Sequence, residues 1–183
     1  MTVRPIRYLG DPVLRRPAKR VEDVNDSIRH LIEDMIESMH EAQGVGLAAP
    51  QIGVGLQVVV LGMPDEEPFA LVNPRVTSQS GTREMDAEGC LSVPGYRGTL
   101  NRSIRVTVEA LDAHGRQIEI TADNDLLAEA LEHEVDHLNG VLYVDRVLDL
   151  GKLQKLRGTS WSEPDEPDGE AERETTAPSG RSR

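Results

Sequence analysis

The chain has 183 residues, a formal net charge of −12, 3% aromatic residues and one cysteine, so an internal disulfide is excluded and a reducing compartment such as the cytoplasm is favoured. No apolar run approaches the roughly 18 residues that a membrane-spanning helix needs, and the start lacks the apolar core of a signal peptide. An acidic chain without a basic stripe is a poor nucleic-acid binder, so we expect neither a membrane partner nor direct nucleic-acid binding.

Prolines and apolar spacing organise the first part of the chain. Residues 1–24 contain three prolines and predict an irregular arm. A long amphipathic helix follows, with Asn25 or Asp26 as its cap and Gly44 as its stop. Its buried stripe has helical spacing and comprises Ile28, Leu31, Ile32, Met35, Ile36 and Met39.

Four stretches further along have the composition of β-strands. The runs at 56–63 and 68–77 are apolar and rich in β-branched residues, so each predicts a buried strand. Apolar and polar residues alternate in 104–112 and 117–122, and these two stretches flank a short turn sequence, "AHGR". This pattern predicts a β-hairpin.

A second helix and a polar tail complete the chain. Residues 123–140 predict a helix whose inward side comprises Leu126, Leu127, Ala130, Leu131, His133, Glu134 and His137. A short helix near 148–157 also fits the pattern. Residues 158–183 hold seven acidic and three basic side chains and one large apolar residue, Trp161. Because such a segment buries too little surface to offset its ordering entropy, we predict a folded domain at 1–157 and a disordered acidic tail at 158–183.

The second predicted helix carries the sequence "HEVDH". His133 and His137 are one helical turn apart, so both imidazoles project from one face and can share a cation. Glu134 lies about 100° further round, where it can take a proton from a bound water. Asp136 is a candidate either to orient a ligand or to pair with an arginine. A solvated helix face is the alternative, but burying two histidines and a glutamate without a partner is unfavourable.

A catalytic metal site usually has three protein ligands, and no histidine follows His137. Asp145 and Asp149 are acidic but lack the sequence context of metallopeptidase ligands. Upstream, "EGCLSV" contains Cys90 in a glycine-flanked stretch. A lone cysteine is commonly a small buried hydrophobe, yet its thiolate is also a good ligand for a borderline divalent metal. Cys90 with the two histidines would leave one position open for water.

The stretch "GVGLAAPQIG", residues 44–53, formally matches the dinucleotide-binding pattern G-x-G-x-x-A. That pattern requires a strand before it and a helix after it, whereas here a long helix precedes it and Pro50 would disrupt a helix. The small residues instead suit a loop against which a ligand backbone lies. Gln51 then offers an amide donor to a carbonyl group, although a simple helix-to-strand turn would also explain the glycines.

Together, "GVGLAAPQ", "EGCLS" and "HEVDH" resemble the three motifs of peptide deformylases, and the resemblance runs from about residue 5 to about residue 155. It implies an α+β fold with antiparallel β-sheets packed around a central metal-binding helix. It also implies a cytoplasmic, monomeric hydrolase that removes the formyl group from the N-terminal formylmethionine of nascent polypeptides, releases formate and contacts the ribosome transiently. Iron(II) is the usual metal of the family, and zinc, nickel or cobalt can replace it.

The resemblance also assigns roles. The metal ligands would be Cys90, His133 and His137. Glu134 would be the general base and then the acid, while Gln51 and the backbone N–H of Leu91 would form the oxyanion hole. The backbones that pair with the substrate would be those of Val45, Gly46 and Gly89. The methionine pocket would be lined by Val45, Leu126, Ala130 and the flank of His133.

Three acidic residues depart from the family pattern. Glu132 stands where glutamine is common, and Glu129 and Asp86 stand where apolar or basic residues often line the pocket entrance. They suggest a preference for basic or polar residues after the methionine, and the alternative is three ordinary solvated acids. The lack of a long insertion at 62–70 suggests the shorter, type 1 subtype.

Two other functions remain open from the residues themselves. One is a metallopeptidase that uses "HEVDH" with an unrecognised ligand, and its metal would survive Cys90→Ala. The other is a structural metal domain or an inactive binding homologue. A closed four-ligand site would favour the latter, but the chain has no second cysteine to close one.

Overall fold

The structure is a computed structural model, and it describes residues 2–156. Its strands form two antiparallel sheets, one in the order β1-β2-β3-β6-β7 and one in the order β4-β5-β8. The larger sheet comprises β1 (Gly46–Ala48), β2 (Val58–Leu61), β3 (Phe69–Ser80), β6 (Arg105–Leu111) and β7 (Gln117–Asp123). The smaller sheet comprises β4 (Arg83–Cys90), β5 (Val93–Arg102) and β8 (Gln154–Lys155). The predicted strands and hairpin of the larger sheet are thereby confirmed.

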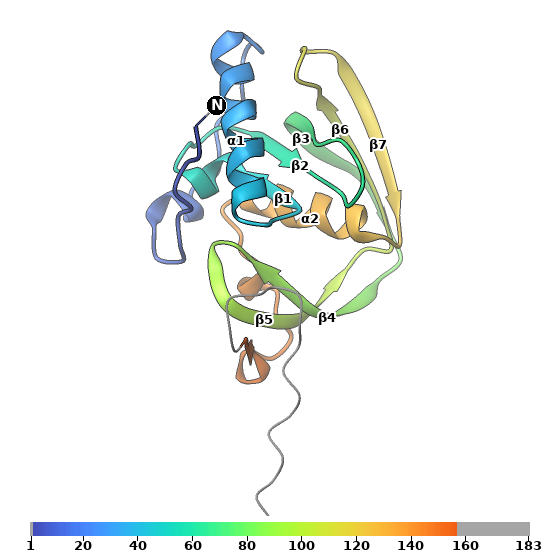
Figure 1. Ribbon diagram of the computed structural model, residues 1–183. Helices are drawn as coiled ribbons and strands as arrows, with labels where there is room; N and C mark the ends of the chain where they lie inside the picture. Colours follow the sequence, from blue (N-terminus) through green and yellow to red (C-terminus); the bar gives the residue numbers. More distant parts are fainter. Residues whose placement is uncertain (1, 157–183) are drawn as a thin grey trace, which may run out of the picture.

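Helix α1 (Asp26–Glu41) forms because its apolar residues fall on one stripe, as predicted. The side chain of Asn25 caps it by accepting the N–H of Ile28. The helix packs against β1 and β2 (Figure 1). It ends before Gly44, whose N–H donates back to the carbonyl of Met39, so the chain turns sharply into β1.

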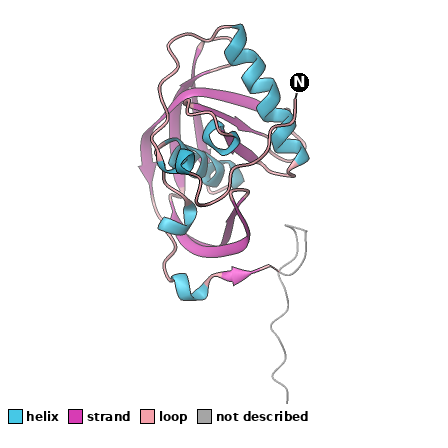
Figure 2. Cartoon of the chain, turned by 90° about the vertical axis from the view of Figure 1, so that its left-hand side faces the viewer, coloured by secondary structure: helices cyan, strands magenta, loops and turns pink. Residues whose placement is uncertain are grey.

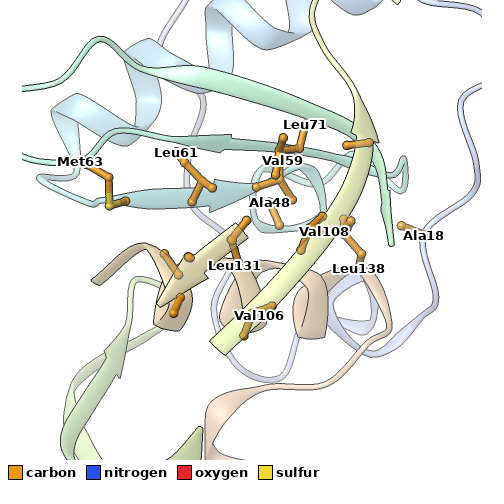
Figure 3. Packing of buried hydrophobic residues seen from close by; sticks show 14 residues of the cluster. Ala18, Ala48, Val59, Leu61, Met63, Leu71, Val106, Val108, Leu131 and Leu138 are labelled. Atoms are coloured by element: carbon orange, nitrogen blue, oxygen red, sulfur yellow. The ribbon is translucent and has the colours of Figure 1, made fainter. Parts of the chain in front are cut away.

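Helix α2 (Leu126–Leu138) lies between the two sheets, as Figure 1 shows. Asp125 caps its start by accepting the N–H of Ala128. Its sheet-facing side packs Leu131 and Leu138 against apolar residues of β2, β3 and β6 (Figure 3). This burial fixes the helix in place and turns its adjoining face toward the smaller sheet. The predicted α+β fold around a central helix is confirmed.

Two features differ from the sequence prediction. Strands β4 and β5 were not predicted, because their polar and glycine-rich residues lack the apolar alternation of a typical strand. The short helix expected near 148–157 is wrong: this part of the chain has a single 3₁₀ turn (Leu150–Lys152) and then β8, which pairs with β5 (Figure 2).

Several of the segments that connect the helices and strands contain short 3₁₀ turns. Single 3₁₀ turns cover Pro12–Arg15 in the amino-terminal arm, Ala49–Ile52 after β1 and Tyr143–Asp145 after α2. Within residues 2–156 no helix is long and apolar enough to cross a membrane. The predicted tail at 158–183, Trp161 included, lies outside the described residues.

Candidate active site

A cleft of about 280 Å³ lies where α2, the β1 loop and the end of β4 meet. The three motifs, far apart in the sequence, all contribute to its walls. The predicted catalytic and substrate-binding residues that line it are Val45, Gly46, Gln51, Gly89, Leu91, Leu126, Ala130 and Glu134. Of the predicted metal ligands, Cys90 and His133 line the same cleft, and His137 is buried directly behind it.

Cys90, His133 and His137 converge. Their potential ligand atoms all lie within 4.8 Å of one another, and Cys90 Sγ is 3.2 Å from His137 Nε2. One thiolate and two imidazoles are the donors that zinc or another borderline divalent metal prefers in a three-ligand catalytic site. Beside them, Glu134 Oε2 is buried and has no hydrogen-bond partner among residues 2–156. A metal with a bound water fits this donor set, because the water would satisfy that orphaned oxygen.

The pKa values of His133 and His137 are shifted in opposite directions. Burial, together with the positive charges of His133 and Arg102, holds the pKa of His137 well below its ordinary value, which keeps it neutral. Burial also acts to lower the pKa of His133, but the charge and hydrogen bond of Cys90 and the hydrogen bond of Glu88 outweigh it and raise this pKa well above 6.5. A metal that binds here must therefore displace a proton from His133.

Glu88 orients His133, and the sequence analysis did not assign it a role. Its Oε1 lies 2.6 Å from His133 Nδ1, which leaves the opposite ring nitrogen facing Cys90 and His137. Arg102 donates to both oxygens of Glu88, with Nε at 2.8 Å and NH2 at 2.6 Å. Burial acts to raise the pKa of Glu88, but the hydrogen bonds from Arg102 and His133 outweigh it and lower this pKa to about 2. Glu88 therefore stays ionised.

Asp136 extends this buried chain of charges to the surface. Its Oδ2 accepts Arg102 NH1 at 2.7 Å, and Arg146 binds both of its oxygens at 2.6 Å. Of the two roles that the sequence left open for Asp136, pairing with an arginine is the one that the structure contains. Arg102 thus bridges α2 to β4 and holds the helix in register with the strand that carries Cys90.

Glu134 approaches the β1 loop very closely. A Cβ placed on Gly46 would lie 2.5 Å from Glu134 Oε1 and 3.0 Å from its carboxyl carbon. The first motif therefore needs glycine at this position to make room for the glutamate. Burial raises the pKa of the Glu134 carboxyl to about 7, which suits a group that must both accept and return a proton near neutral pH.

The side-chain amide of Gln51 is held with its nitrogen toward Cys90. Its Oε1 accepts the N–H of Ala48 at 2.8 Å, which fixes the orientation of the amide. Its Nε2 then lies 3.2 Å from Ser92 Oγ and 3.7 Å from Cys90 Sγ. The alternative of a simple turn does not account for this buried, directed amide.

The three departing acids occupy different environments. Glu132 is buried outside the cleft and accepts hydrogen bonds from Gln79 Nε2, Ser103 N and Ser103 Oγ. Glu132 therefore adds no charge to the cleft wall, because its carboxylate faces β3 and the β5–β6 turn. Asp86 is exposed and does not line the cleft. Glu129 does line it.

A model of the polypeptide deformylase family matches residues 3–153 of this chain. The chain belongs to the polypeptide deformylase family. A peptide deformylase of Heliobacterium modesticaldum is 49% identical over 147 residues, which cover 80% of this chain and 95% of that protein. A peptide deformylase of Dehalococcoides mccartyi is 45% identical over 157 residues, which cover 85% of this chain and 93% of that protein. The family prediction is confirmed.

Solved deformylase structures share the fold. A peptide deformylase from Legionella pneumophila superposes with a TM-score of 0.77 at 49% identity, covering 81% of this chain and 88% of that one. A peptide deformylase from Ehrlichia chaffeensis in complex with actinonin gives a TM-score of 0.79 at 37% identity, covering 82% of this chain and 92% of that one. The likeness thus spans both sheets and the central helix.

The deformylase motifs identified the cleft residues but not their supports. Glu88, Ser92 and Arg102 were missed. Glu88 precedes Cys90 by two positions, and residues two apart on a strand share a face. Recognising residues 83–90 as a strand would therefore have placed Glu88 on the same face as Cys90.

Proposed function

We propose that this chain is a metal-dependent hydrolase that removes the formyl group from N-terminal formylmethionine and releases formate. The observation that carries this conclusion is the convergence of Cys90, His133 and His137 beside a buried, unpartnered oxygen of Glu134. A closed structural metal site is disfavoured, because three donors converge among residues 2–156 and they adjoin an open cleft.

We propose one divalent metal per chain, with iron(II) as the physiological ion and zinc, nickel or cobalt as alternatives. A thiolate with two imidazoles accepts all four, so availability and redox conditions decide which is loaded. When bound, the metal supplies Lewis acidity, which acidifies a water and polarises the formyl carbonyl. Cys90, His133 and His137 would hold it, with His133 steadied by Glu88.

The proton-transfer role falls to Glu134. Its carboxylate takes a proton as water attacks the formyl carbon and then gives it to the nitrogen that leaves. Its pKa near 7 favours both directions of transfer. Glycine at position 46 leaves room for this carboxylate beside the β1 loop, because a Cβ there would lie 2.5 Å from Glu134 Oε1.

Negative charge grows on the formyl oxygen during attack, and we propose that two donors stabilise it. Gln51 Nε2 is one, because Ala48 and Ser92 hold the amide in place before the substrate arrives. The backbone N–H of Leu91, at the turn after Cys90, is the other. Removing one such donor typically raises the barrier by about 3–4 kcal/mol.

The substrate would bind as an added strand. Strand β1 is an edge of the larger sheet and β4 an edge of the smaller one, and both border the cleft. An extended peptide could therefore pair with the backbones of Val45 and Gly46 on one side and Gly89 on the other. Leu126, Ala130 and the flank of His133 would receive the methionine side chain.

The proposed activity also suggests partners and a cellular location for the protein. The partners would be nascent formylmethionyl polypeptides, so we place the protein in the cytoplasm, in transient contact with the ribosome. We propose that the monomer is active, since every residue of the proposed mechanism comes from one chain. Residues 1–157 would form the catalytic domain, and 158–183 an acidic tail.

Formate release from formyl-Met-Ala-Ser by iron(II)- or nickel-loaded protein under anaerobic conditions tests the proposal. Acetyl-Met-Ala-Ser is the matched control, because its extra methyl group must enter the space around the formyl carbon. Rapid release from the formyl peptide alone is expected. No release from folded, fully metallated protein would refute the function. Cleavage of internal peptide bonds, with metal retained in Cys90→Ala, would establish the metallopeptidase alternative instead.

A further inference from the structure

The amino-terminal arm links the two turns that carry the proposed oxyanion donors. Gln51 belongs to the 3₁₀ turn after β1, which is part of the larger sheet, whereas Leu91 and Ser92 form the turn between β4 and β5 of the smaller sheet. The backbone N–H of Arg7 donates to the carbonyl of Gln51 at 2.7 Å. The backbone N–H of Leu9 donates to the carbonyl of Ser92 at 2.8 Å. Two residues of the arm thus connect one turn to the other.

Apolar side chains anchor this connection at both ends. Ile6 packs against the apolar cluster beneath α1, to which Ile52, the residue after Gln51, belongs. Leu14 is completely buried and shares a cluster with Cys90 and Val93, the residues on either side of the β4–β5 turn. The arm is therefore fixed to the larger sheet before the two hydrogen bonds and to the smaller sheet after them.

Between these anchors the backbone of the arm provides the contacts. Tyr8 and Leu9 are 57% and 50% exposed, and the Tyr8 N–H donates no hydrogen bond to any residue in the range 2–156. The Tyr8 carbonyl accepts the N–H of Asp11 at 3.0 Å, and Gly10 has a φ of +110°. Residues 8–11 thus form a turn of the type II kind, with Leu9 in its second position. The hydrogen bond of the Leu9 N–H to Ser92 starts from this turn.

The proposed oxyanion hole depends on the separation of these two turns. Gln51 Nε2 and the N–H of Leu91 would act on one oxygen atom, yet they belong to segments that follow different sheets. Ser92 also touches both sides, since its Oγ lies 3.2 Å from Gln51 Nε2. Donors lower the barrier when they are already aimed at the place where charge develops, so a shift of one turn against the other would weaken both.

We propose that residues 7–9 are a positioning element of the oxyanion hole, in which the N–H groups of Arg7 and Leu9 hold Gln51 and the β4–β5 turn at the separation that the reaction requires. The inference rests on the proposed deformylase function and extends it to a segment outside the three motifs. Neither arm residue lines the cleft, so both act through the turns they bind. Loss of either bond should lower kcat and leave KM nearly unchanged, because the oxyanion develops only in the transition state.

Leu9→Pro tests the bond to the β4–β5 turn. Proline has no N–H, and the second position of a type II turn accepts its fixed φ, so the donor is removed without straining the turn. Tyr8→Pro is the matched control, because it removes an N–H that has no partner. Formate release from formyl-Met-Ala-Ser by full-length, nickel-loaded protein should show a kcat about tenfold lower in Leu9→Pro, less than the hundredfold or more lost with a whole donor. Tyr8→Pro should keep the wild-type kcat and KM.

A double-substitution cycle separates positioning from a general loosening of the arm. Arg7→Pro should also lower kcat by about tenfold in the wild type, because it frees the Gln51 turn. In the Gln51→Ala background the amide that Arg7 positions is already gone, so Arg7→Pro should lower kcat by less than about twofold. Equal fractional losses in the two backgrounds would overturn the inference. A wild-type kcat in Leu9→Pro, or an equal loss in Tyr8→Pro, would also overturn it.

An ester at position 9 tests the same bond if proline prevents folding. Incorporation of the α-hydroxy acid that corresponds to leucine replaces the N–H with an oxygen atom and keeps the side chain, and kcat should again fall about tenfold. An unchanged kcat would overturn the inference. The wild type distinguishes the two levels of the proposal. If folded, metallated wild type releases no formate, the deformylase function fails, whereas full activity in the arm variants refutes the positioning role alone.

Discussion

The carboxylate of Glu134 occupies space that any side chain at position 46 would need. A Cβ on Gly46 would lie 2.5 Å from Glu134 Oε1, well inside van der Waals contact. The first motif and the third therefore meet at this point, because the absence of a side chain at position 46 leaves the space that the Glu134 carboxylate fills.

Gly46→Ala should therefore displace Glu134 and lower kcat. A displacement of about 1 Å in a catalytic group can reduce the rate by about a hundredfold, and we expect a loss of that order. Steady-state formate release measures it. Gly55→Ala is the matched control, since a Cβ at Gly55 meets nothing within 4 Å. Unchanged kcat in Gly46→Ala would show that the carboxylate has more freedom than this contact allows.

Glu88→Gln should weaken metal binding. The substitution keeps the size of the side chain but removes the charge that Arg102 and His133 share, so His133 loses its fixed orientation. Loss of such a supporting group typically lowers metal affinity or activity by about 10- to 100-fold. Competition with a chelator measures the affinity, and Glu84→Gln, an exposed substitution on the same strand, is the control. Equal affinities for wild type and Glu88→Gln would contradict the assigned role.

The lowered pKa of Glu88 allows a prediction of how the stability of the fold depends on pH. Its pKa is about 2 in the folded protein and about 4.5 when unfolded, so folding gains stability that is present above pH 4.5 and lost as the pH falls toward 2. The gain is about 3 kcal/mol, and about 2 kcal/mol of it should be lost by pH 3. Urea unfolding of chelator-treated protein at pH 6 and pH 3 checks this. The wild type should lose more stability than Glu88→Gln over that interval, and equal losses would mean that Glu88 is not the responsible group.

Glu132 should matter for stability and not for catalysis. Its carboxylate joins α2 to β3 and to the β5–β6 turn through hydrogen bonds from Gln79 and Ser103. Glu132→Ala removes the hydrogen bonds donated by Gln79, which is exposed, and by the partly buried Ser103, which should lower the free energy of unfolding by about 1–3 kcal/mol, the net contribution of one or two hydrogen bonds to a charged group. Chemical denaturation measures the loss, and kcat of the folded variant should equal that of the wild type. A reduced kcat without loss of stability would return Glu132 to the active site.

The sequence predicted both helices because their apolar residues repeat at a local period, as Ile28, Leu31 and Met35 do in α1. The strands β4 and β5 were not predictable in the same way. Residues such as Glu84, Asp86 and Gly89 have little strand preference, and the hairpin is held by pairing with its own partner strand and with β8. The β4–β5 hairpin therefore depends on contacts between residues that lie far apart in the sequence, as in the pairing of β5 with β8.

The candidate site also contains some residues that the sequence could identify and others that it could not. The spacing of His133 and His137 is typical of a metal-binding helix, and Cys90 falls in the second of the three deformylase motifs, so the candidate ligands could be named from the sequence. Glu88 and Arg102 belong to residue types that usually face water. Only the folded chain reveals that their side chains are each 2% exposed and bound to each other. Glu132 is the opposite case: it is next to His133 in the sequence, but its side chain lies on another side of the helix, outside the cleft.

In the proposed mechanism Glu134 transfers the proton, while Cys90, His133 and His137 hold the metal. The most direct measurement is formate release by Glu134→Ala, together with its metal content. We expect metal bound in the same ratio as in the wild type and loss of nearly all turnover, because the three proposed ligands remain and the proposed base does not. A Glu134→Ala protein that turns over formyl-Met-Ala-Ser at the wild-type rate would contradict it.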